Sequence, residues 1–130
     1  MVELIEAAKA ARTNAYAPYS VYRVGAAVLG SDGQVYTGCN VENVSYGLTV
    51  CAERTAVVKM VSEGCREIRA VAVATKDGGT PCGQCLQTLL EFALDPADLK
   101  VCCVSEDGNE KAFTLAELLP HGFRSELKNE

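Results

Sequence analysis

Three cysteines in two separate stretches place the strongest constraint on the fold of this chain. Cys51-Ala52-Glu53 and Pro81-Cys82-Gly83-Gln84-Cys85 each lie at the predicted start of a helix. The two residues between Cys82 and Cys85 allow both thiolates to reach one tetrahedral zinc ion, and Cys51 can supply a third sulfur. Three protein ligands leave the fourth position open, as in a catalytic zinc site. We therefore expect a fold that brings two helix starts together around one zinc ion.

The position of these residues at helix starts has a geometric and an electrostatic reason. In the middle of a helix, side chains two residues apart point roughly 200° away from each other, so Cys51 and Glu53 could not share a site there. Three thiolates on Zn²⁺ leave a negative centre, which the positive ends of two helix dipoles stabilise. We expect Arg54 to add a positive charge and to hydrogen-bond one or more ligand sulfurs.

Glu53 is the predicted proton carrier of this site. Zinc lowers the pKa of a bound water from about 15.7 to around 7, which makes a hydroxide nucleophile available at neutral pH. Glu53 can take the proton from this water and deliver it to a ring nitrogen and a leaving amine. A lone glutamate at a helix start is more often a solvated residue that favours the dipole. Its place beside Cys51 favours the catalytic role.

Hydrophobic periodicity predicts the elements that carry these motifs. Thr114 and Glu117 have the spacing of a capping box at the start of the last helix. The alternation of helices and strands predicts an α/β fold, a three-layer α/β/α sandwich with a five-stranded mixed sheet. The expected helices are a first segment that ends before Ala17, then 51–63, 83–92 and 115–119, and the expected strands are 21–29, 34–39, 68–74, 101–104 and 111–113.

Length and composition limit the classes of protein that the chain can belong to. A chain of 130 residues is expected to form one domain, here residues 1–130. The formal net charge of -5 disfavours a nucleic-acid partner, which would need a basic surface. The start of the chain lacks a basic segment followed by an apolar block, and no apolar run has the length of a membrane span, so we expect a cytoplasmic protein without a membrane partner. The seven cysteines are then thiols or metal ligands rather than disulfides.

With these residues placed, the chain resembles the small homotetrameric cytidine deaminases. Cys-Ala-Glu followed by Pro-Cys-x-x-Cys is the three-cysteine variant of the zinc deaminase pattern. The resemblance covers almost the whole chain up to Phe123. It is carried by Ala15-Tyr-Ala-Pro-Tyr-Ser20, Val24-Gly-Ala-Ala27, Thr37-Gly-Cys-Asn-Val-Glu-Asn43, Ser45-Tyr-Gly-Leu-Thr49, Cys51-Ala-Glu-Arg-Thr-Ala56 and Glu117-Leu-Leu-Pro120.

This resemblance implies the hydrolytic deamination of cytidine and deoxycytidine to uridine and deoxyuridine in pyrimidine salvage, with one Zn²⁺ per subunit. It implies that Asn40 and Glu42 hold the ribose hydroxyls. The backbone at Ala52, together with Glu53, would hold the base, and an aromatic ring at Tyr22 would pack against the nucleoside. Two further aromatic residues, Tyr46 and Phe123, would complete the pocket of a neighbouring subunit, so the homotetramer would be part of the active site.

Several residues depart from the family pattern. Tyr22 stands where phenylalanine is expected, and Leu86 stands where an arginine usually follows the last ligand cysteine. Gln84 replaces a small residue, the loop before Pro81 is short, and His121 precedes Gly122-Phe123 where Gly-Ala-Phe is common. These changes concern substrate preference and the charge balance at the metal. We expect Arg54 to be the main charge partner of the thiolates.

Three alternatives remain open from the sequence. A deaminase of a modified cytosine nucleoside, such as blasticidin S, shares the zinc motif. A non-catalytic zinc-binding or thiol-redox module is disfavoured by Glu53 and by the lack of a fourth ligand. A polynucleotide-editing deaminase is disfavoured by the acidic balance. Residues outside the motif, His121 and the cysteines Cys39, Cys65, Cys102 and Cys103, are expected to have no role in the metal site.

Overall fold

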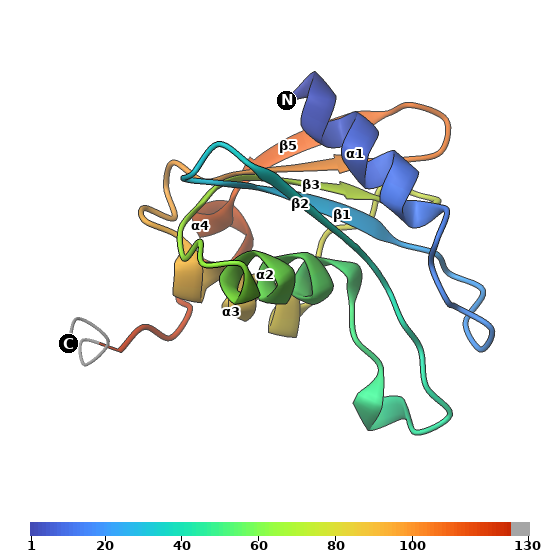
Figure 1. Cartoon of the computed structure of the whole chain (residues 1–130). Coiled ribbons are helices and arrows are strands. Elements are labelled where there is room, and N and C mark those ends of the chain that lie inside the picture. The colour runs from blue at the N-terminus through green and yellow to red at the C-terminus, as the bar shows by residue number, and fades with distance from the viewer. Residues whose placement is uncertain (126–130) are drawn as a thin grey trace.

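The computed structural model describes residues 1–125, and within them the predicted order of elements is confirmed. Each element predicted above has a counterpart, with boundaries that differ by a few residues (Figure 1). A short 3₁₀ helix, Tyr46–Leu48, precedes the second α-helix. The elements are α1 (Val2–Arg12), β1 (Gly25–Gly30), β2 (Val35–Cys39), α2 (Ala52–Ser62), β3 (Ile68–Ala74), α3 (Gly83–Phe92), β4 (Lys100–Val104), β5 (Glu110–Thr114) and α4 (Leu115–Leu118).

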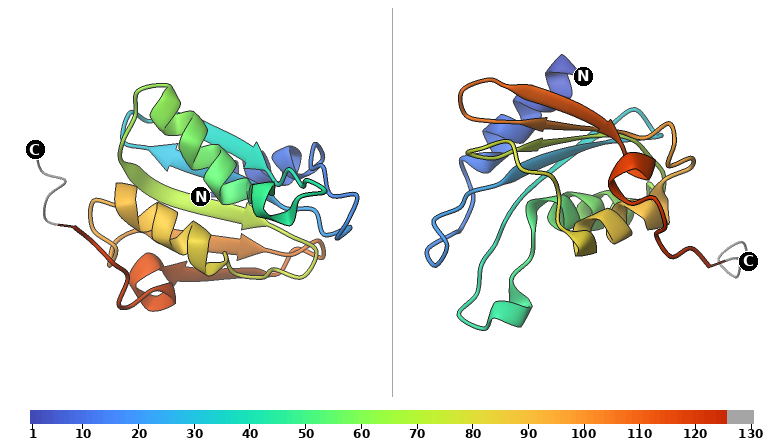
Figure 2. Two further views of the ribbon diagram at one scale, coloured as in Figure 1. Left: turned by 90° about the horizontal axis from the view of Figure 1, so that it is seen from below. Right: turned by 180° about the vertical axis from the view of Figure 1, so that it is seen from behind.

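Within the described residues, the five strands form one mixed sheet in the order β2-β1-β3-β4-β5 (Figure 2). The pair of β3 and β4 is parallel, whereas the other three pairs are antiparallel. A parallel pair needs a crossover connection, and α3 is the helix between β3 and β4. The end of β3 therefore leads directly into the loop that carries Cys82.

Helices cover both faces of the sheet, as predicted for a three-layer sandwich. Figure 1 shows α1 on one face and α2, α3 and α4 on the other. Side chains of β3 alternate between the two cores: Val71 and Val73 pack in the cluster with α2 and α3, and Ala72 and Ala74 pack in the cluster with α1. This alternation follows from the two-residue period of a strand, and because both faces are covered the strand is apolar on each side.

Gly38 on β2 fixes the distance between the sheet and α2. A Cβ atom at Gly38 would lie 2.6 Å from both the carbonyl oxygen of Ala52 and the amide nitrogen of Ala56. Real side chains do not tolerate such a distance, so a residue without Cβ is needed for α2 to pack this closely. The start of α2, with Cys51 and Glu53, is positioned by this contact.

The strand predicted over 21–29 begins only at Gly25. Val21 has a φ of 59°, which is a left-handed conformation that a β-branched residue rarely adopts. This backbone breaks the extended run, so Tyr22 and Val24 lie in a loop instead of a strand. The prediction failed because apolar and β-branched composition alone does not reveal such a turn.

The last helix is confirmed together with its cap. The Thr114 side chain accepts a hydrogen bond from the amide of Glu117, and the Glu117 side chain accepts one from the amide of Thr114. The helix ends at Leu118, one residue earlier than predicted. Neither α4 nor any other helix within residues 1–125 has the length and apolar character required to span a membrane.

Candidate active site

The three predicted zinc ligands meet where α2 and α3 begin. Cys51 is the N-cap residue of α2, Cys82 is the N-cap residue of α3, and Cys85 lies in the first turn of α3. The sulfur of Cys82 lies 3.9 Å from that of Cys51 and 3.5 Å from that of Cys85. All three sulfurs lie within 4.8 Å of one another. In a tetrahedral site with Zn–S bonds of about 2.3 Å, ligand sulfurs are separated by about 3.8 Å, so this cluster fits one zinc ion.

Arg54 supplies the positive charge that the sequence predicts at the thiolates. One guanidinium nitrogen donates to the Cys51 sulfur at 3.7 Å and to the carbonyl of Thr49 at 3.2 Å. Hydrogen bonds from Cys85 and from Arg54 lower the pKa of Cys51 to about 5. The hydrogen bond with Cys51, followed by burial, raises the pKa of Cys85. Leu86 is buried in the core and brings no charge to the site. Within residues 1–125, Arg54 is the arginine whose side chain hydrogen-bonds a sulfur of the cluster.

Glu53 is buried beside the sulfur cluster. Its side chain is only 5% exposed, although it lies in the first turn of α2, where an acidic residue is usually solvated. Burial is the main cause that raises the pKa of Glu53, because the charged carboxylate is poorly solvated there. A carboxyl group with a raised pKa holds a proton up to a higher pH than an exposed carboxyl group does. The position and the burial of Glu53 therefore suit a proton carrier.

A cavity of about 300 Å³ opens in front of these residues. Its wall contains most of the residues that the family resemblance assigns to substrate binding. Tyr46 and Phe123 are absent from the wall, and both rings are exposed to solvent, by 80% and 76% respectively. The predicted residues that line it are Tyr22, Asn40, Glu42, Cys51, Ala52, Glu53 and Cys82.

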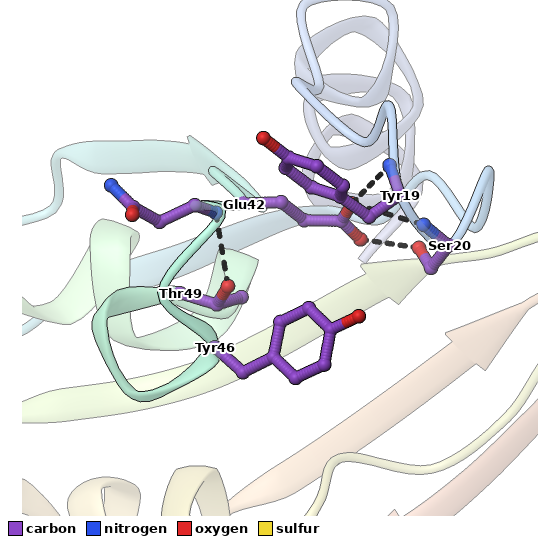
Figure 3. A pocket seen from close by; sticks show the side chains of 6 residues that line it. Tyr19, Ser20, Glu42, Tyr46 and Thr49 are labelled. Carbon is purple, nitrogen blue, oxygen red and sulfur yellow. Dashed lines mark hydrogen bonds between the residues drawn. The ribbon is translucent and has the colours of Figure 1, made fainter.

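A second hollow of about 320 Å³ adjoins this cavity and shares Ser20, Glu42 and Thr49 with it. Figure 3 shows the Glu42 carboxylate pointing toward Ser20, with the rings of Tyr19 and Tyr46 on opposite sides of it. Glu42 accepts hydrogen bonds from the amides of Tyr19 and Ser20, at 3.0 and 3.1 Å, and from the Ser20 hydroxyl. The hydrogen bond from the Ser20 hydroxyl lowers the pKa of Glu42, so its carboxylate is charged and fixed in direction.

Asn40 is buried and holds the loop that carries Tyr22. Its Nδ2 donates to the carbonyl of Tyr22 at 2.8 Å, and its Oδ1 accepts from the amide of Val24 at 2.9 Å. An amide group has two N–H donors and two acceptor lone pairs, so one donor and one acceptor site remain for a ligand. Asn40 therefore has a structural contact that the sequence did not predict.

Seven further residues line the cavity without having been assigned a role from the sequence: Ser20, Val24, Thr49, Val73, Thr75, Gly79 and Thr80. Ser20 belongs to the stretch 15–20, which carries part of the family resemblance, and that resemblance could have indicated Ser20 as a residue of the cavity. Thr75, Gly79 and Thr80 come from the loop after β3, whose short length was noted but whose residues were not assigned. The predicted non-ligand cysteines Cys39, Cys65, Cys102 and Cys103 are free and lie outside the sulfur cluster.

Comparison with known proteins decides the family. The sequence model of the cytidine and deoxycytidylate deaminase zinc-binding region matches residues 2–104. A cytidine deaminase from Halalkalibacterium halodurans is 50% identical over 129 residues, which cover 98% of this chain and 96% of that protein. This chain belongs to the cytidine and deoxycytidylate deaminase family. A second member, the cytidine deaminase of Mycobacterium tuberculosis, is 52% identical over 115 residues, or 87% of this chain and 81% of that protein.

Solved structures of this deaminase family share the fold. The crystal structure of cytidine deaminase from Burkholderia pseudomallei is 45% identical, with a TM-score of 0.87 over 94% of this chain and 98% of that one. The cytidine deaminase structure from Mycobacterium tuberculosis is 40% identical, with a TM-score of 0.80 over 95% of this chain and 97% of that one. The predicted family and the predicted α/β architecture are both confirmed.

Proposed function

We propose that this chain catalyses the hydrolytic deamination of cytidine and deoxycytidine, with release of ammonia, as a step of pyrimidine salvage. The observation that carries the proposal is the buried Glu53, which lies two residues from Cys51 and lines the same cavity as Cys51 and Cys82. A purely structural zinc site would be closed by a fourth protein ligand. Within residues 1–125, the cluster contains three cysteines and no further His, Cys, Asp or Glu ligand.

The three cysteine thiolates would hold the zinc ion, with Arg54 balancing part of their charge. When bound, zinc supplies Lewis-acid activation of water at neutral pH. Glu53 would take one proton from that water and pass it to the ring nitrogen of the base. It would then take the second proton from the hydroxyl group added to the ring carbon and pass it to the amine, so that the carbonyl forms as the C–N bond breaks and ammonia leaves. The raised pKa of Glu53 supports this role, because its carboxyl group must both accept and donate.

The remaining residues of the cavity would bind and orient the nucleoside. We assign the ribose hydroxyls to Asn40 and Glu42, whose carboxamide and carboxylate are held in fixed directions. The backbone of Ala52 and the side chain of Glu53 would hold the base, with the Tyr22 ring against the nucleoside. The support is that all five residues line one cavity.

We propose that the active unit is a homotetramer in which a neighbouring subunit completes the pocket. Two hydrogen bonds from the Gln87 side chain fix the backbone of Phe123. The Gln87 Nε2 donates to the carbonyl of Phe123 at 2.7 Å, and the Gln87 Oε1 accepts from the amide of Phe123 at 3.2 Å. The Phe123 ring is nevertheless exposed, as is that of Tyr46. A fixed backbone with an exposed aromatic ring is typical of a residue that contacts a partner.

Residues 1–130 would act as one domain, and we place the protein in the cytoplasm. All seven cysteines are free, including the pair of ligands Cys82 and Cys85, whose sulfurs are close together. A reducing compartment keeps such thiols available for zinc.

A panel of substrates tests the proposal. Purified protein of known zinc content is mixed in parallel with cytidine, deoxycytidine and blasticidin S, and the fall in ultraviolet absorbance is followed. We expect turnover of cytidine and deoxycytidine. Activity on blasticidin S alone would instead assign the chain to a modified nucleoside. A zinc-loaded protein that deaminates none of the three would contradict the proposal.

A further inference from the structure

Two departures from the family pattern, Tyr22 and the short loop before Pro81, meet in the structure. The Tyr22 hydroxyl donates a hydrogen bond to the Asp77 carboxylate, with 2.6 Å between the oxygens. These residues are separated by 55 positions in the sequence. Tyr22 lines the candidate nucleoside cavity, and Asp77 belongs to the loop after β3 that leads to Cys82.

The Asp77 carboxylate also organises its own loop. Its Oδ1 accepts from the amide of Gly79 at 3.2 Å and from the Thr75 hydroxyl at 3.3 Å. The Thr75 hydroxyl oxygen in turn accepts from the amides of Gly78 and Gly79, at 2.7 and 3.1 Å. The loop is therefore folded around one carboxylate and one hydroxyl, and three of its residues, Thr75, Gly79 and Thr80, form part of the cavity wall.

On its other side, the Tyr22 backbone is held by Ser20 and by Asn40, which we assign to the ribose. Its amide donates to the Ser20 hydroxyl at 3.0 Å, and its carbonyl accepts from Asn40 at 2.8 Å. The left-handed conformation of Val21 precedes it, so this backbone depends on such contacts to persist. The hydrogen bond between Tyr22 and Asp77 is thus a side-chain link from the sugar side of the cavity to the loop that leads to Cys82.

Tyr22 also lines a second cavity. This is a hollow of about 630 Å³, lined among others by Lys76, Asp77 and Lys111. The orientation of the Tyr22 ring therefore shapes both this hollow and the nucleoside cavity. A hydroxyl bound to Asp77 keeps the ring in one orientation.

We propose that Asp77 is a positioning residue, which acts through the Tyr22 hydroxyl to fix the Tyr22 ring and the loop 75–79 as a wall of the nucleoside cavity. This inference rests on the proposed function, because it concerns the binding of the nucleoside. Burial and the hydrogen bond to Asp77 raise the pKa of Tyr22, whereas the hydrogen bond from Tyr22 lowers the pKa of Asp77. Both directions keep a neutral donor and a charged acceptor around neutral pH.

The test compares KM and kcat for cytidine in four variants of the zinc-loaded protein: Tyr22→Phe, Asp77→Ala, their double variant and Asp77→Asn. Loss of the hydrogen bond between Tyr22 and Asp77 should raise KM about 3- to 10-fold in Tyr22→Phe, with kcat changed by less than about 2-fold. Asp77→Ala should raise KM at least as much, because it also removes the bonds from Thr75 and Gly79. The double variant should show no larger rise in KM than Asp77→Ala alone, because the bond that Tyr22→Phe removes is already lost in Asp77→Ala. Because asparagine retains an acceptor oxygen, the rise in KM should be smaller in Asp77→Asn than in Asp77→Ala.

Tyr36→Phe is the matched control. It removes another hydrogen bond between a tyrosine hydroxyl and an aspartate, the bond of 2.5 Å from Tyr36 to Asp32, and neither residue lines the nucleoside cavity. We expect its KM to equal that of the wild type. Far-ultraviolet circular dichroism and zinc content show that each variant is folded and loaded, and Tyr22→Phe and Asp77→Asn remain informative if Asp77→Ala does not fold.

Three results would overturn the proposal. The first is an unchanged KM for cytidine in Tyr22→Phe. The second is a fold-rise in KM in the double variant that equals the product of the fold-rises in the two single variants. The third is a rise in KM in Tyr36→Phe as large as that in Tyr22→Phe. Each of these leaves the proposed function intact, because the wild type still deaminates cytidine. A wild-type protein without activity on cytidine or deoxycytidine overturns the proposed function and this inference together.

Discussion

A guanidinium nitrogen of Arg54 lies 3.7 Å from the sulfur of Cys51 and also donates to the carbonyl of Thr49. The contact joins the charge partner of the zinc site to the residue that caps α2. Leu86, which stands where the family usually has an arginine, is buried in the core. The charge balance of the three thiolates therefore depends on Arg54.

Replacement of Arg54 should weaken the hold on zinc. We expect Arg54→Ala to lose roughly 10- to 100-fold in zinc affinity, because residues that hydrogen-bond metal ligands typically contribute this much. Arg54→Lys keeps the positive charge but lacks the planar guanidinium donor, so its zinc affinity should lie between those of the wild type and Arg54→Ala. Zinc retained after dialysis against a chelator measures the effect. Unchanged zinc content and turnover in Arg54→Ala would refute the role.

Substitution of a ligand sulfur should remove the metal. Cys82→Ser is expected to bind far less zinc than the wild type and to lose deamination, since a serine hydroxyl is a poor zinc ligand beside two thiolates. Cys39→Ser is the matched control, because Cys39 is a free cysteine outside the cluster. Metal analysis of both variants decides the matter. Full zinc in Cys82→Ser would disprove the ligand set.

Two inactive variants should restore activity in a shared assembly if Phe123 completes the pocket of a partner. Phe123→Ala keeps Glu53 but lacks the exposed ring, whereas Glu53→Gln keeps the ring but lacks the proton carrier. Co-expression of the two variants should produce mixed assemblies with some intact pockets, and therefore more activity than either variant alone. Full activity of Phe123→Ala by itself, or no gain on co-expression, would contradict the shared pocket.

The hydrogen bond from Tyr36 to Asp32 predicts a pH dependence of stability. It raises the pKa of Tyr36 from 10.0 to about 12 and lowers the pKa of Asp32 below 3.8. A raised tyrosine pKa gives stabilisation that is complete below pH 10 and is lost as the pH rises through about 12. A lowered aspartate pKa gives stabilisation that is present above pH 3.8 and is lost as the pH falls through the folded value.

The urea midpoints of the wild type and of Tyr36→Phe test this dependence. The midpoint of Tyr36→Phe should be lower at neutral pH, and the difference should narrow above pH 10 and again below pH 3.8. A difference that stays constant across these limits would show that the hydrogen bond does not couple the two groups.

The structure brings the three cysteines of the sequence motif together, and part of the signal that pointed to them is local. Cys82 and Cys85 lie at the start of one helix, and Cys51, Glu53 and Arg54 at the start of another, so spacing places each group. The meeting of the two groups was inferred from the need of one zinc ion for several ligands. Long-range contacts left no such signal. Two such contacts are the hydrogen bond from Tyr22 to Asp77 and the hydrogen bond that Asn40 accepts from the amide of Val24. Both involve the loop that follows the left-handed residue Val21, where composition had predicted a strand.

The proton transfer by Glu53 is the central claim, and Glu53→Gln tests it most directly. The glutamine has nearly the same shape and should leave the three sulfurs in place, but it cannot carry a proton. We expect full zinc content with a loss of roughly 100- to 10,000-fold in the rate of cytidine deamination, followed by ultraviolet absorbance. A zinc-loaded Glu53→Gln protein that deaminates cytidine at the wild-type rate would contradict the account.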